Sequence, residues 1–183
     1  MKQLSGWHVA VACAAVFSMA GTGWAASLMV DNFNRGDKPK ALGGDIGSWD
    51  KDPADATQMC TITFERSGAL GDTGYSLRLD YDVDSPNPAY NGFWMKLTGA
   101  DLSSYKTLTL HIKGDASRGY TTQVKLELKN GTETGRYLLK GITDQWQKVR
   151  IPLKEFEGIS TWKGMTEEGN VFTISLPNPL PPG

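Results

Sequence analysis

Hydrophobic and polar residues alternate along three long segments of the chain with a period of two. In residues 75–84, for example, Leu77, Leu79 and Tyr81 interleave with Arg78. A strand places successive side chains on opposite faces, so this pattern predicts β-strands with one buried and one polar face. The other two clean segments are residues 107–113 and 122–129, and weaker candidates are residues 28–33, 58–65, 92–97, 136–140 and 147–153.

Turn residues separate these predicted strands. Asn130-Gly131 is the dipeptide typical of a type I′ turn, and it predicts a hairpin between the strands on either side of it. Helix is expected only in short stretches, near residues 153–156 and 162–166. Short antiparallel strands with one wet face predict an all-β fold, an antiparallel two-sheet β-sandwich or jelly roll. We expect this single domain to span residues 26–168.

The start of the chain has the features of a secretory signal peptide. Lys2 precedes an apolar run over residues 9–17, and small residues occupy the positions before a cleavage point after Ala25. The apolar run is shorter than the about 20 residues that a membrane span needs. We therefore expect residues 1–25 to be removed and the protein to be exported to the periplasm or the medium, without a membrane span.

Composition and charge narrow the class of protein. Hydrophobic residues make up 39% of the chain, which excludes wholesale disorder. The 19 basic and 20 acidic side chains nearly cancel, so the chain as a whole lacks the positive charge typical of nucleic-acid binding. Without residues 1–25, Cys60 is the only cysteine, which excludes an intramolecular disulfide and suggests a buried thiol.

The sequence contains few candidate catalytic residues. His111 is the only histidine after residue 25, and no nucleophile motif accompanies it. A zinc site would need more His or Cys ligands than remain. Asp80, Asp82 and Asp84 share one strand face, and glycosidases need only two carboxylates, but acids on a solvated strand are ordinary. We therefore favour a protein that is not an enzyme.

Aromatic and polar residues on the predicted outward faces indicate carbohydrate binding. Flat rings match the C–H faces of a sugar, and polar side chains match its hydroxyls. We expect Trp94 and Trp146 to be stacking surfaces, with these hydroxyl partners on the same sheet face: Asp80, Asp82, His111, Lys125 and Arg136. The alternative is that both indoles belong to a second core layer. A protein-binding or assembly module using the same face is the alternative function.

Three segments carry a resemblance to a known family: residues 75–97, 105–115 and 141–156. They resemble the galactose-binding-like jelly rolls that include family eleven carbohydrate-binding modules and the complex I intermediate-associated protein 30 group. The resemblance implies a β-sandwich that binds a polysaccharide or oligosaccharide or assists assembly. It also implies a calcium site that would include Asp31.

The family pattern ends with two closing strands, and this chain departs from it there. A divergent, proline-rich tail, residues 169–183, takes their place, and only residues 170–176 could form a further strand. We therefore expect residues 28–33 to lie at an uncovered sheet edge. An uncovered edge has free N–H and C=O groups that can pair with another chain, so self-association through this edge is expected.

Overall fold

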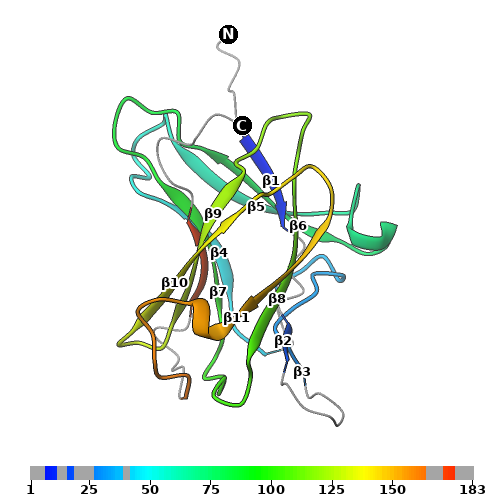
Figure 1. The fold of residues 1–183 in the computed structure, drawn as a ribbon. Helices are drawn as coiled ribbons and strands as arrows, with labels where there is room; N and C mark the ends of the chain where they lie inside the picture. The colour runs from blue at the N-terminus through cyan, green and yellow to red at the C-terminus, as the bar shows by residue number, and fades with distance from the viewer. Residues whose placement is uncertain (1–6, 12–15, 19–26, 39–41, 164–170, 176–183) are drawn as a thin grey trace.

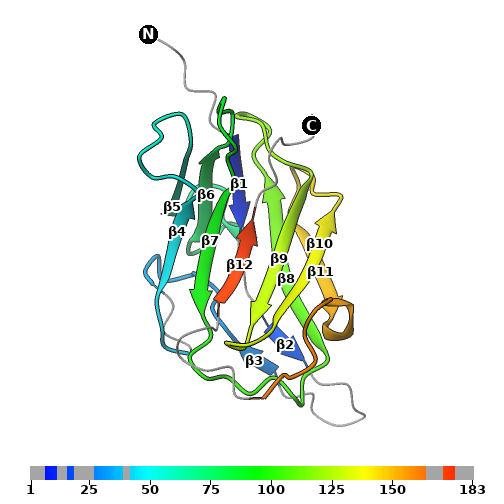
Figure 2. The same ribbon diagram turned by 90° about the vertical axis from the view of Figure 1, so that its left-hand side faces the viewer.

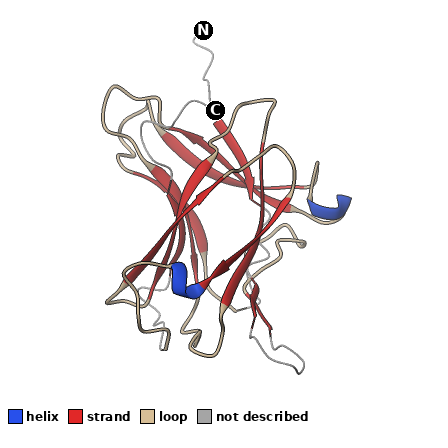
Figure 3. Ribbon diagram, in the orientation of Figure 1, coloured by secondary structure: helices blue, strands red, loops and turns tan. Residues whose placement is uncertain are grey.

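The protein is a sandwich of two antiparallel β-sheets, as the alternation predicts (Figures 1 and 3). The computed structural model describes residues 7–11, 16–18, 27–38, 42–163 and 171–175. Within these residues, only two short 3₁₀ turns interrupt the strands and loops, η1 (Leu70–Asp72) and η2 (Leu153–Glu155). No helix among the described residues is long and apolar enough to cross a membrane.

One sheet has seven strands. Its order is β3-β2-β8-β1-β6-β5, and β11 also pairs with β8. Its strands are β1 (Trp7–Val11), β2 (Val16–Ser18), β3 (Ser27–Met29), β5 (Met59–Glu65), β6 (Ser76–Asp82), β8 (Thr107–Gly114) and β11 (Gln147–Pro152).

The other sheet has five strands in the order β10-β9-β12-β7-β4 and faces the viewer in Figure 2. Its strands are β4 (Ile46–Asp50), β7 (Asn91–Lys96), β9 (Gln123–Lys129), β10 (Thr134–Lys140) and β12 (Val171–Ser175). The last strand in sequence, β12, therefore lies in the middle of this sheet, between β9 and β7.

The core fills the space between the two sheets with the apolar residues of the alternating segments. Leu77, Leu79 and Tyr81 on β6 are completely buried, as are Phe93 and Met95 on β7. Each such side chain contributes about 1.5–3 kcal/mol relative to an exposed one. Their polar neighbours along each strand must then lie on the outward faces, which is where any binding surface has to form.

Most of the predicted strands are confirmed, including the three clean ones. The prediction for residues 28–33 was too long, because the strand there is β3 and ends at Met29. The alternation did not predict β4. The helix expected at residues 162–166 is absent from residues 162–163, the part of that segment that the structure describes. Cys60 is a buried free thiol, as expected, and burial raises its pKa to about 12.

The predicted hairpin forms between β9 and β10, but not through a type I′ turn. The register pairs Lys129 with Thr134, so four residues make the loop. Asn130 is not in the left-handed region that a type I′ turn requires; only Gly131 has a positive φ there. The Asn130 side chain instead accepts hydrogen bonds from the backbone N–H groups of Thr132 and Glu133. This side-chain cap replaces the tight turn.

Both ends of the chain supply strands. β1 and β2 fall within residues 1–25, and β1 lies between β6 and β8. Cleavage after Ala25 stays a prediction, and it would remove both strands. The candidate strand at residues 170–176 is confirmed as β12, although it joins the five-stranded sheet and does not pair with β3. Residues 176–183 of the predicted tail lie outside the described residues.

Candidate binding face

The outward face of the five-stranded sheet carries a continuous row of residues across all five strands. Gly47 on β4 is opposite Trp94 on β7, which is opposite Thr173 on β12. Thr173 is in turn opposite Glu127 on β9, and Glu127 is opposite Arg136 on β10. We call this surface the Trp94 face. Its members are Gly47, Trp49, Trp94, Lys96, Lys125, Glu127, Lys129, Arg136, Leu138 and Lys140.

Trp94 lies against the backbone of the neighbouring strand. A Cβ atom placed on Gly47 would meet the indole Cζ2 at 2.7 Å and Nε1 at 3.0 Å. The side chain is half-buried, and it is absent from the partly buried hydrophobic side chains that pack against the core. A glycine at position 47 therefore lets the ring settle on the sheet surface. Trp94 belongs to the outward face and not to a second core layer.

Two further aromatic residues extend this surface, and the sequence interpretation missed both. Trp49 is opposite Gly92 on β7, which puts it diagonally next to Trp94. Its ring contacts that of Tyr90 edge-on, with centroids 5.8 Å apart, and Tyr90 is 45% exposed. The spacing of residues could have pointed to Trp49. Gly47 and Trp49 are two residues apart on a strand whose first residue, Ile46, is buried, so both face outward.

A cluster of charges occupies the other half of the Trp94 face. Lys125 Nζ lies 3.0 Å and Arg136 Nε 3.7 Å from Oε1 of Glu127, while Lys129 Nζ lies 3.2 Å from Oε2. The Glu127 side chain is 11% exposed, whereas the three cations are 36–57% exposed. The carboxylate thus lies beneath the cations that surround it.

Burial and ion pairing act in opposite directions on Glu127. Removal from water favours the neutral acid, but hydrogen bonds and the charges of Lys125 and Lys129 outweigh that effect and lower the pKa of Glu127. The carboxylate is therefore ionised at neutral pH. Because both of its oxygens already have cationic partners, it holds the cations in place more than it offers an acceptor to a ligand.

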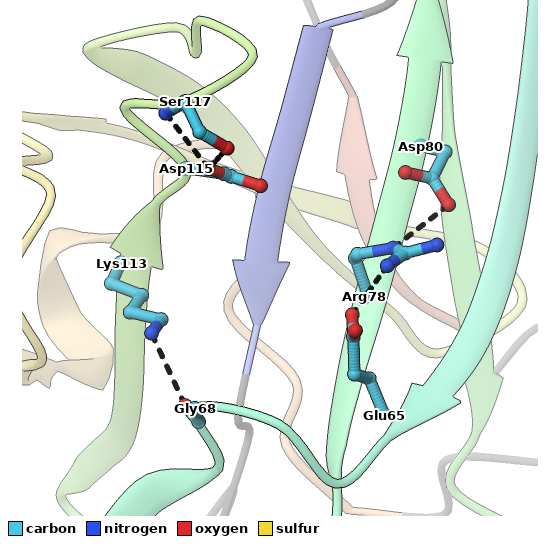
Figure 4. A network of polar contacts seen from close by, with 7 residues as sticks. All are labelled: Glu65, Gly68, Arg78, Asp80, Lys113, Asp115 and Ser117. Carbon is cyan, nitrogen blue, oxygen red and sulfur yellow. Dashed lines mark hydrogen bonds and ion pairs between the residues drawn. The ribbon is translucent and has the colours of Figure 1, made fainter.

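The acidic residues predicted for the site lie on the opposite side of the sandwich. Asp80 and Asp82 belong to β6 of the seven-stranded sheet, and both are buried. Asp80 accepts a hydrogen bond from Arg78 Nε at 3.0 Å, and Arg78 also pairs with Glu65 (Figure 4). Burial raises the pKa of Asp82, whose Oδ1 accepts the backbone N–H of Asp84. We call this surface the Asp80 face.

His111 and Trp146 are on the same side as Asp80. His111 on β8 is opposite Lys148 on β11. The Trp146 N–H donates to the carbonyl of Gly68 at 3.2 Å, and Lys113 Nζ lies 5.1 Å from the Trp146 ring centre. Lys113 donates to the same carbonyl. Trp146 therefore ties the loop after β5 to the β8 side of the sheet, as the Lys113–Gly68 contact in Figure 4 also does.

The expectation of one sheet face for all seven residues is wrong. The structure brings together Trp94, Lys125 and Arg136 on the Trp94 face, and it places four others on the opposite side of the sandwich: Asp80, Asp82, His111 and Trp146. Alternation distinguishes inward from outward in each strand, but two sheets have two outward faces.

The calcium site implied for Asp31 receives limited support. The Asp31 side chain is buried; Oδ1 accepts the backbone N–H of Phe33 at 2.6 Å, and Oδ2 has no hydrogen-bond partner. Calcium takes six to eight oxygen ligands. Nowhere in the described part of the chain do three or more His, Cys, Asp or Glu side chains gather around a possible metal position. A calcium site at Asp31 therefore stays a prediction.

Comparison with known families adds one finding. The model of the family described as Carbohydrate binding domain (family 11) matches residues 19–171. This match covers β3 to β11, including every residue of the Trp94 face. It does not confirm a relation to the complex I intermediate-associated protein 30 group. No curated protein and no solved structure matches the chain.

Proposed function

The chain belongs to family 11 of the carbohydrate-binding domains, and we propose that the Trp94 face is where it binds a glycan. The observation that carries this proposal is the position of Trp94, half-buried against Gly47 and outside the core. An indole on a sheet surface offers an apolar plane to a sugar ring. Trp49 and Tyr90 lie beside it and enlarge the aromatic surface.

Polar contacts would come from the neighbouring strands. The Lys125 and Arg136 side chains are 43% and 57% exposed. Lys125 lies on β9, next to β12, and Arg136 lies on β10, one strand further from Trp94. Their N–H groups can donate to sugar oxygens. Domains of this family are binding modules without catalysis, and we propose that role here. The Asp80 face has no part in it, because Asp80 and Trp146 are engaged in contacts within the protein.

A glycan array followed by two matched variants tests this proposal. Trp94→Ala and Trp146→Ala remove the same side chain from opposite faces of the sandwich. We expect Trp94→Ala to weaken binding to the best array ligand at least tenfold, with little change in melting temperature. Trp146→Ala should leave the affinity unchanged. Loss of binding only in Trp146→Ala, or no glycan bound by the wild type, would overturn the proposal; the latter would favour a protein-binding module.

We also propose that the protein is exported and that residues 1–25 are removed. The apolar run after Lys2 and the small residues before Ala26 support this. Removal would take β2 away from β3 and leave β3 as an unpaired edge, which favours self-association. Intact-mass measurement of the exported protein tests the cleavage, and a mass retaining Met1 would contradict it. Sedimentation over a concentration series tests the association, and a monomer throughout would contradict it.

A further inference from the structure

Positive charge is concentrated on the Trp94 face. The charged residues of β7, β9 and β10 are Lys96, Lys125, Glu127, Lys129, Arg136 and Lys140, which is five cations and one carboxylate. These three strands therefore carry a net charge of +4, whereas the whole chain has a formal net charge of −1. The protein's overall charge hides a local excess of cations at the proposed site.

The single carboxylate cannot neutralise this excess. Glu127 balances one of the three cations around it, and the remaining two leave the cluster at +2. All three cations keep a substantial exposed surface, while Glu127 is almost covered. Arg136 approaches Glu127 through Nε, and no ion pair among the described residues engages its terminal nitrogens. Several N–H donors are therefore directed to solvent.

The hydrogen-bonding groups that this cluster exposes are donors. Lysine and arginine side chains donate hydrogen bonds and cannot accept them. Glu127 is the acceptor in the cluster, and each of its oxygens already has a cationic partner. Neutral sugars present hydroxyl groups that both donate and accept, so they need acceptors as well as donors. A surface made of donors alone suits a ligand group that only accepts, and carboxylate and sulfate are such groups.

The cluster lies within reach of a ligand stacked on Trp94. Glu127 is two strands away from Trp94 in the same row across the sheet, and only β12 lies between them. Two strand spacings amount to about 10 Å. A chain of a few sugars crossing the strands could therefore stack on Trp94 and place a charged substituent among Lys125, Lys129 and Arg136.

From these observations we propose that the ligand of the Trp94 face is an acidic glycan, one that carries carboxylate or sulfate groups. This inference rests on the proposed function. Aromatic rings beside cations also suit single-stranded nucleic acid, but the family match favours a carbohydrate. The charged groups would bind the lysines and Arg136, while the sugar rings would stack on the aromatic half of the face.

Matched pairs of polysaccharides test the charge of the ligand directly. Affinity electrophoresis of the full chain at about 0.15 M salt would compare polygalacturonate with its fully methyl-esterified form, and dextran sulfate with dextran. The first pair isolates a carboxylate and the second isolates a sulfate. We expect at least tenfold stronger binding to the charged member of one pair. Equal binding to charged and neutral members would overturn the inference and leave the proposed function intact.

Charge-matched variants connect the effect to this face. Lys125→Gln should weaken binding to the acidic glycan about tenfold, and Lys125→Arg should restore most of it. Lys148→Gln, which removes an exposed cation from the Asp80 face, should have no effect. Equal losses in Lys125→Gln and Lys148→Gln, or binding of an oligothymidylate as strong as that of the glycan, would show general polyanion attraction and overturn the inference. Absence of any glycan binding would overturn the proposed function as well.

Discussion

At the scale of single residues, the Trp94 face depends on a glycine that has no role in binding itself. Gly47 does not have a positive φ, so its value here is the missing side chain and not the backbone conformation. The Trp94 indole occupies the space that a Cβ would need. The orientation of the proposed stacking surface is thus set by the residue opposite it on β4.

Gly47→Ala should therefore weaken glycan binding without unfolding the protein. A methyl group 2.7 Å from indole Cζ2 must displace the ring, because contacts that short do not persist. We expect a three- to tenfold loss of affinity, measured by isothermal titration, and a melting temperature within a few degrees of the wild type. Ser48→Ala, the next residue on the same strand, is the control and should bind normally. An unchanged affinity in Gly47→Ala would show that the ring orientation is irrelevant.

The stability of the fold should depend on pH through His111, which lies on the Asp80 face. Its Nδ1 is buried without a hydrogen-bond partner, and burial together with the nearby Lys148 charge lowers the pKa of His111. In the unfolded chain the same side chain takes up a proton near pH 6.5. As the pH falls through about 6.5, the unfolded chain binds this proton more readily than the folded protein does, so the free energy of unfolding decreases.

His111→Gln should remove part of this pH dependence. We expect the free energy of unfolding of the wild type to fall between pH 7.5 and 5.5 by more than that of the variant, measured by urea denaturation. Both proteins are made as the full chain, so that they differ only at position 111. Identical slopes would mean that His111 is protonated as easily in the folded state as in the unfolded one.

At the scale of elements, the strands were predictable and their arrangement was not. Leu77, Leu79 and Tyr81 alternate with polar residues, and β6 follows from that pattern. β4 escaped prediction because Gly47 contributes no side chain to the alternation. Nothing in the period of a strand says which sheet it joins, so Trp94 and Asp80 were assigned to one face although they lie on opposite sides of the sandwich. Sheet order depends on contacts between distant segments.

β1 is the element whose position has the largest consequence. Ala10 is opposite both Arg78 on β6 and Lys113 on β8, so β1 joins the two halves of the seven-stranded sheet. Figure 4 shows β1 running between the strands that carry these two residues. A proline there removes one N–H from the ladder and introduces a ring that a central strand does not accommodate.

Ala10→Pro should destabilise the full chain, expressed without export so that residues 1–25 are retained. Losing one backbone hydrogen bond costs about 0.5–1.5 kcal/mol, and the proline ring adds to that cost, so we expect a loss of at least that size in urea denaturation. Ala10→Ser, which keeps the backbone N–H, serves as the control and should have a smaller effect. Equal stability of Ala10→Pro and the wild type would indicate that the folded protein does not need β1 between β6 and β8.

At the scale of the whole molecule, the two outward faces differ in chemistry. The Trp94 face combines aromatic rings with an excess of cations, whereas on the Asp80 face Arg78 pairs with both Glu65 and Asp80. A surplus of a single sign attracts an oppositely charged ligand more strongly than paired charges do. This difference adds to the position of Trp94 as a reason to assign binding to the Trp94 face.

The most direct test of that assignment is a nuclear magnetic resonance titration of the ¹⁵N-labelled full chain with its best array ligand. Each of the six tryptophans has an indole N–H that reports on its own surroundings, and variants such as Trp94→Phe assign the signals. We expect the indole signals of Trp94 and Trp49 and the backbone amides of β7 and β9 to shift, while the Trp146 indole stays in place. Shifts confined to Trp146 and to the amides of β6 and β8 would place the ligand on the Asp80 face and contradict the assignment.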